Sequence, residues 1–71
     1  MRLEIIGFWP DYDDDNAYAV VQIEKTIQVI NKLKLTDLRF VVDSNIIEVW
    51  VPITEDGKYI SSDESATYID L

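Results

Sequence analysis

The chain contains no cysteine and no histidine. Without cysteine there is no disulfide, no thiolate nucleophile and no cysteine-ligated zinc or iron–sulfur site. Without histidine, the commonest general base and the commonest transition-metal ligand are also missing. Only two glycines are present, too few for a glycine-rich loop that cradles phosphate. We therefore expect no enzymatic activity, no catalytic residue, no metal site and no cofactor.

Basic residues are also few, because six Lys and Arg stand against 14 Asp and Glu, for a formal net charge of −8. Such a charge repels phosphates, so direct binding to nucleic acid or to an anionic membrane is disfavoured. A protein partner with a basic surface is favoured instead. The alternative explanation is that the charge only keeps a small protein in solution.

Long hydrophobic runs are lacking as well, and no segment approaches the length of a membrane span. The absence of cysteine fits a reducing compartment, so we expect a cytoplasmic protein. What the sequence does have is a hydrophobic fraction of 48% in 71 residues. That fraction is typical of folded proteins, and the length allows one core, so residues 1–71 are expected to form a single small domain.

The clearest periodic pattern predicts an amphipathic helix from about residue 16 to residue 33. An acidic residue among Asp13, Asp14 and Asp15 would cap its start, and Lys32 and Lys34 would favour its end. Apolar residues recur within the segment at steps of three and four, on one stripe: Ala19, Val20, Ile23, Ile27, Ile30 and Leu33.

Strands are expected on either side of this helix. Residues 2–9 read as a strand that Pro10 ends. Residues 38–43 and 46–53 alternate in hydrophobicity around Asp43-Ser44-Asn45, which predicts an antiparallel hairpin whose far end loses pairing at Pro52. After a second turn at 55–58, residues 58–60 form a short strand, and the tail is either a helix from Ser61 or a strand over 67–69.

The expected fold class is therefore α+β. One amphipathic helix packs on a small antiparallel or mixed sheet, in a two-layer β-α-β-β order with a short C-terminal strand or helix. A single helix covers a single face of a sheet. The other face would carry a mixture of apolar, aromatic and charged side chains: Arg2, Glu4, Ile6, Phe8, Arg39, Val41, Ile46, Glu48 and Trp50.

Aromatic residues and arginine among charged neighbours are typical of an interface, and an exposed apolar patch generally marks a contact. Three occupants of that face remain open: the C-terminal tail with Tyr59, Tyr68, Ile69 and Leu71, a second copy in a homodimer, or a different protein. The residues predicted to form this partner or dimer face are Ile6, Phe8, Arg39, Val41, Glu48 and Trp50.

A second candidate surface is acidic, and its predicted partner-binding residues are Asp11, Asp13, Asp14, Asp15, Glu55 and Asp56. Carboxylates grouped on one side of a small protein can occupy the positions that phosphates take on the basic surface of a nucleic-acid-binding protein. In size and charge the chain is similar to phage-encoded inhibitors, anti-CRISPR and other DNA-mimic proteins. We therefore expect an acidic module that binds a nucleic-acid-handling protein. The alternative is a structural homo-oligomer or small subunit that self-associates through its exposed sheet face.

Neutralising Asp13, Asp14 and Asp15 to asparagine should weaken binding to such a partner and flatten its dependence on salt, because surface charge attraction is screened by ions. Affinity measured at several salt concentrations tests this. Unchanged affinity would show that the acidic surface is not the contact.

Overall fold

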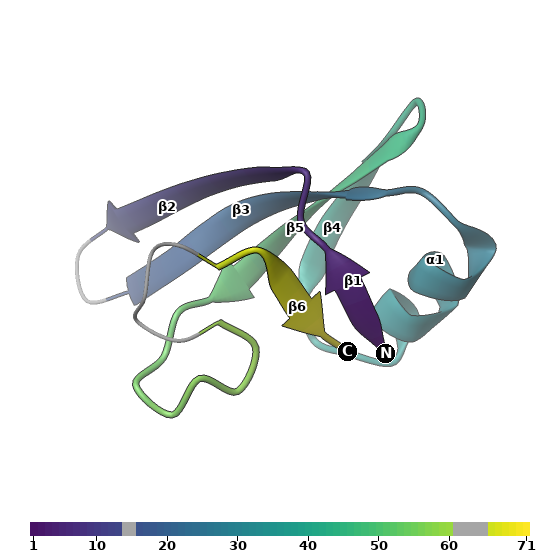
Figure 1. The fold of residues 1–71 in the computed structure, drawn as a ribbon. Helices are drawn as coiled ribbons and strands as arrows, with labels where there is room; N and C mark the ends of the chain where they lie inside the picture. Colours follow the sequence, from purple (N-terminus) through teal and green to yellow (C-terminus); the bar gives the residue numbers. More distant parts are fainter. Residues whose placement is uncertain (14–15, 61–65) are drawn as a thin grey trace.

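The computed structural model describes residues 1–13, 16–60 and 66–71. Within these residues the chain forms six strands in two antiparallel sheets and one short helix (Figure 1). The elements are β1 (Arg2–Glu4), β2 (Gly7–Asp13), β3 (Asn16–Glu24), α1 (Ile27–Lys34), β4 (Arg39–Asp43), β5 (Ile46–Pro52) and β6 (Tyr68–Asp70). The expected α+β class is confirmed, whereas the β-α-β-β order is not.

The larger sheet has the strand order β2-β3-β5-β4, and β1 pairs with β6 in a separate two-stranded sheet. Figure 1 shows the small sheet, α1 and the segment after β5 on the same side of the larger sheet, with the two chain ends adjacent. There the amino group of Met1 donates to the Leu71 carbonyl at 2.9 Å, and the Leu71 N–H donates back to Met1 at 2.8 Å. The first and last strands are thus held together at the terminal residues.

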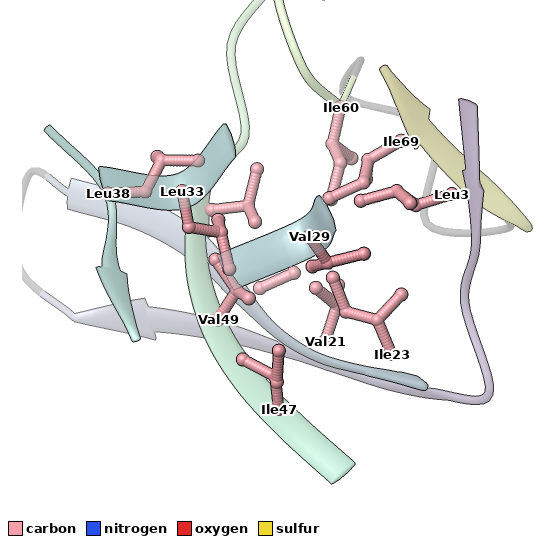
Figure 2. Close-up of a cluster of buried hydrophobic side chains, with 12 residues drawn as sticks. Leu3, Val21, Ile23, Val29, Leu33, Leu38, Ile47, Val49, Ile60 and Ile69 are labelled. Atoms are coloured by element: carbon pink, nitrogen blue, oxygen red, sulfur yellow. The ribbon is translucent and has the colours of Figure 1, made fainter. Parts of the chain in front are cut away.

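The core fills the space between the larger sheet and these covering elements. Alternate residues of β3 and β5 point into it, as the twofold repeat of a strand requires. Figure 2 shows Leu3, Ile60 and Ile69 together on one side of the cluster, with Val29 between them and Val21 and Ile23 of the sheet. The buried cluster consists of Leu3, Ala19, Val21, Ile23, Val29, Leu33, Leu38, Ile47, Val49, Val51, Ile60 and Ile69.

The helix expected over residues 16–33 is wrong for its first half. Residues 16–24 form β3, and α1 begins only at Ile27 after an extended Thr26, whose hydroxyl accepts from the Val29 N–H at 3.2 Å. Thr26, rather than an aspartate, is therefore the N-cap. Lys32 and Lys34 lie in the last turn as expected. No helix in the described ranges is long and apolar enough to cross a membrane.

The single strand expected over residues 2–9 is also wrong, because the chain leaves β1 after Glu4 and starts β2 at Gly7. Pro10 lies inside β2 and does not end it. Since β2 pairs on one side only, with β3, a proline is tolerated there.

The hairpin expected over residues 38–53 is confirmed as β4 and β5, joined at Ser44-Asn45 with Ser44 at a φ of 52°. The pairing of β5 with β4 ends at Trp50, two residues before Pro52. Residues 58–60 form no strand, although Ile60 makes an isolated parallel bridge with Ile53. Of the two expectations for the tail, the final strand is observed as β6, and the helix expected from Ser61 falls outside the described residues.

Leu33→Ala and Leu35→Ala form a matched pair that tests this packing, because Leu33 is 0% exposed and Leu35 is 83% exposed. Removing the buried side chain should cost about 2–5 kcal/mol of unfolding free energy. Removing the exposed one should change it by less than about 0.5 kcal/mol. Urea unfolding followed by circular dichroism measures both, and equal losses would contradict the placement of α1.

Candidate functional site

One face of the larger sheet packs on the core, and the other is covered by no element of the described chain (Figure 1). We call this second face the open face. Cross-strand pairing assigns its members, since directly opposite residues point to the same side of a sheet. They are Gly7, Trp9 and Asp11 of β2, Tyr18, Val20, Gln22 and Glu24 of β3, Ile46, Glu48, Trp50 and Pro52 of β5, and Arg39, Val41 and Asp43 of β4.

A continuous row of large side chains crosses the middle of the open face. Trp9 is paired with Val20, Val20 with Trp50, and Trp50 with Arg39. We call these four residues the aromatic row. The guanidinium carbon of Arg39 lies 4.6 Å from the centroid of the Trp50 ring, a cation–π distance. Trp9, at the other end, is 52% exposed.

The neighbouring row explains how the Trp9 ring is placed. A Cβ added to Gly7 would lie 2.8 Å from two atoms of the Trp9 ring and 2.8 Å from the Gln22 side-chain oxygen. The indole ring therefore packs directly over Gly7 and occupies the space that the Cβ of any larger residue would fill. The Gln22 amide then donates to a Glu48 carboxylate oxygen at 3.1 Å. Glycine at position 7 and the glutamine together seat the ring on the sheet.

A groove of about 440 Å³ opens beside the Arg39 end of the aromatic row. The groove lies next to the first residue of β4. The β4–β5 pairing ends there at Arg39 and Trp50, whereas β3 and β5 stay paired for two more residues, to Tyr18 and Pro52. Its lining combines two aromatic rings, a carboxylate, a guanidinium and apolar atoms: Ala17, Tyr18, Asp37, Leu38, Arg39, Trp50 and Pro52. Arg39 already stacks on the Trp50 ring, which shows that the aromatic lining accepts a basic side chain, and the Asp37 carboxylate adds a second feature that favours a cation.

Most charged side chains of the open face are acidic. The acidic residues of the open face are Asp11, Glu24, Asp43 and Glu48, and Arg39 is the one basic residue on it in the described ranges. The other basic residues lie in β1, on or just before α1, and in the 53–60 segment: Arg2, Lys25, Lys32, Lys34 and Lys58. The open face thus concentrates negative charge around an aromatic centre.

The structure brings together five residues of the predicted sheet face, namely Arg39, Val41, Ile46, Glu48 and Trp50. The placement of Phe8 there is wrong, since Phe8 stands opposite Val21 and packs against the core.

The other N-terminal members of the predicted face lie elsewhere. Ile6 is 56% exposed but lies between β1 and β2. Arg2 and Glu4 belong to the other sheet. The C-terminal residues Ile60 and Ile69 are buried in the core, so the described part of the tail covers the opposite face.

The structure describes some, but not all, residues of the predicted acidic surface. Asp11 is exposed in β2, and the backbone of Asp13 ends that strand. Glu55 and Asp56 lie in a turn at the same end of the sheet, because the Ile53 N–H donates to Ala17 near the start of β3 at 3.0 Å. Asp14 and Asp15 fall outside the described residues. Both acidic segments therefore leave the sheet from one end.

The Asp56 carboxylate forms hydrogen bonds within this turn. It accepts from the Thr54 hydroxyl and, at 3.2 Å, from the Lys58 N–H. The Thr54 hydrogen bond first, and then that of the Lys58 backbone, hold the pKa of Asp56 below its usual value. Asp56 therefore stays negative to a lower pH than an ordinary aspartate. The stability that its two hydrogen bonds give to the turn is lost only as pH falls through that lowered pKa.

Sequence reasoning missed Trp9, Tyr18, Val20 and Gln22 as members of this face. The last three lie in the segment expected to be helical. The pattern that would have found them is the alternation of Ala19, Val21 and Ile23 against Tyr18, Val20 and Gln22, which is twofold and rich in β-branched residues.

Comparison of the chain with protein-family models, curated proteins and solved structures found no match. In the described ranges no three acidic side chains are grouped so as to hold a metal ion. The open face and its groove are therefore interpreted from their own chemistry.

Gly7→Ala should displace the Trp9 ring. In a Trp50→Phe background Trp9 is the sole tryptophan, so its emission reports this position alone. We expect a red-shifted emission and stronger acrylamide quenching, because the ring must move away from the new methyl group. The unfolding free energy should change by less than about 1 kcal/mol, since the half-exposed ring can move toward solvent. Trp50→Phe without the second change is the control, and unchanged emission would show that the ring does not rest on Gly7.

Proposed function

We propose that this chain is a non-enzymatic, acidic protein-binding module whose open face docks on a basic surface of another protein. The observation that carries the proposal is the position of the chain's two tryptophans, which lie on one uncovered sheet face ringed by carboxylates. Tryptophan and arginine are the side chains that most often anchor an interface. The surrounding carboxylates supply steering toward a partner of opposite charge.

The groove gives this docking a specific point of contact. A lysine or arginine of the partner that enters it meets the rings of Tyr18 and Trp50 and the carboxylate of Asp37. A ring face and a carboxylate both favour a cation. The groove is open, so entry of a flexible basic side chain requires no opening of the core.

Further acidic residues lie at one end of the sheet, where Asp11 is exposed near the end of β2 and the turn with Glu55 and Asp56 follows β5. Proteins that handle nucleic acid carry basic surfaces built to meet rows of phosphates. Such a protein is the partner class we propose, with inhibition by occupancy of its nucleic-acid site as the consequence. Face-to-face self-association is disfavoured, because it would bring the carboxylates of Asp43 and Glu48 against a second acidic face.

Two double variants with the same change in net charge test the proposal. Asp11→Asn/Asp37→Asn removes one carboxylate from the open face and one from its groove, whereas Glu4→Gln/Asp70→Asn removes two exposed carboxylates from the small sheet. The probe is a short synthetic peptide of alternating lysine, arginine and serine, titrated while the two open-face tryptophans report binding by fluorescence. At roughly 0.2–1 kcal/mol per exposed ion pair, the first variant should bind about 2- to 30-fold more weakly.

The second variant should bind the peptide like the wild type, and added salt should weaken all complexes. Equal losses in both variants would mean that the peptide senses net charge and not the open face. A peptide in which glutamate replaces lysine and arginine serves as the ligand control. A wild type that does not respond to the basic peptide contradicts the proposal.

A further inference from the structure

We propose that the outer edge of β4 pairs antiparallel with β4 of a second copy, centred on Val41, so that two larger sheets join into one continuous sheet. This inference goes beyond the proposed function. The larger sheet ends in β2 on one side and in β4 on the other. An uncovered edge strand is a template for pairing unless the protein blocks it.

The two edges differ in how they are protected. β2 carries Pro10 and exposed Asp11, and proline and charge are devices that keep an edge from pairing. β4 reads Arg-Phe-Val-Val-Asp and has no proline and no bulge, and its two charges have opposite signs and stand at its two ends. Its two valines, Val41 and Val42, are 46% and 42% exposed on opposite faces. β4 is therefore the edge prepared for a partner strand.

Two backbone hydrogen bonds at the ends of the β3–β5 ladder show which way the hydrogen-bonding groups of the sheet point. The Ile53 N–H donates to Ala17, and the Lys25 N–H donates to Asn45, both at 3.0 Å. Both bonds continue the β3–β5 register. In an antiparallel pair the bonded residues alternate, so the odd-numbered residues of β5 turn their backbone groups toward β3.

The even-numbered residues of β5 therefore direct their backbone N–H and C=O groups toward β4, where their partners are Arg39, Val41 and Asp43. By the same alternation, the N–H and C=O groups of Phe40 and Val42 point to the uncovered edge. An arriving strand meets two donors and two acceptors there. The same alternation can be followed from β3 to β2. It places the backbone nitrogen of Pro10 on the outer edge of β2, and proline has no N–H to donate there.

The charges of β4 select one register for a second copy. With Val41 opposite Val41, Arg39 of each copy stands opposite Asp43 of the other, which gives two opposite-charge pairs across the twofold axis. Phe40 then stands opposite Val42, and both use their outward backbone groups. Sliding by two residues in either direction places Arg39 opposite Val41, or Asp43 opposite Val41, and loses both pairs. Opposite-charge and apolar cross-strand pairs each stabilise a sheet.

The same pairing continues the apolar surfaces on both sides. Val41 meets its copy on the open face, while Phe40, already packed against the core cluster, meets Val42 on the covered face. The assembly follows the usual twofold symmetry of homodimers, in which one surface patch serves both copies. The two open faces then lie side by side as one longer docking surface.

Charge reversal provides the test. Arg39→Asp alone places aspartate opposite Asp43, and Asp43→Arg alone places arginine opposite Arg39, so each variant alone should be monomeric. Mixed in equal amounts, the two variants restore both opposite-charge pairs and should form a heterodimer. Sedimentation velocity over a concentration series measures this, with the wild type and the mixture moving toward twice the 8.2 kDa chain mass.

Two further variants separate edge pairing from other contacts. Val42→Pro removes an outward N–H that the β4–β5 ladder does not use, and it should abolish the dimer while circular dichroism stays unchanged. Trp9→Arg alters the open face at the opposite edge of the sheet and should leave the dimer intact. A monomeric wild type, dimeric single charge variants, or a dimer lost only in Trp9→Arg would each overturn the proposal.

Discussion

The pairing of β3 with β5 is the interaction on which the other features depend. Both strands are paired on their two sides, so their register decides the direction of nearly every side chain in the larger sheet. With Val20 opposite Trp50, the alternation buries Val21 and Val49 and leaves the tryptophan on the other side. A shift by one residue would exchange the two faces. The core and the candidate docking surface are therefore two results of one register.

A chain of this length has little with which to cover a sheet. The eight residues of α1, the short β1–β6 pair and the segment after β5 all cover one face, and their apolar side chains meet there in a single cluster. The described residues leave the other face uncovered. Its composition is not that of a solvated surface, because a purely solvated face would be polar throughout.

The sequence predicted some elements well and others poorly, for identifiable reasons. Residues 38–53 alternate strictly around a turn, so the hairpin and the placement of Arg39, Val41, Glu48 and Trp50 followed from local pattern. Residues 16–24 fit a helical stripe and a strand alternation at once, and only the pairing with β2 and β5 decides between them.

The N-terminal residues show a different limit. A strand keeps its facing only while it is continuous, and the change of direction at Ile5 and Ile6 resets the alternation between β1 and β2. Phe8 consequently packs on the core, contrary to the expectation, and Trp9 lies on the open face. Non-local pairing with β6 and β3 caused the break, and no periodicity within residues 2–9 contains that information.

Charge assigns different tasks to the open face and to the β4 edge. The open face has carboxylates around one arginine, and that arginine is drawn over Trp50, so two such faces repel each other and favour a basic partner. The edge carries one charge of each sign at its two ends, so antiparallel copies of it attract. In the proposed dimer the two open faces lie side by side and stay uncovered. Edge pairing would use the outward backbone groups of β4 together with Arg39, Val41 and Asp43, whereas the proposed partner contact centres on Trp9, Trp50 and the groove. The two proposed contacts can therefore coexist, and Arg39 is the residue that both would use.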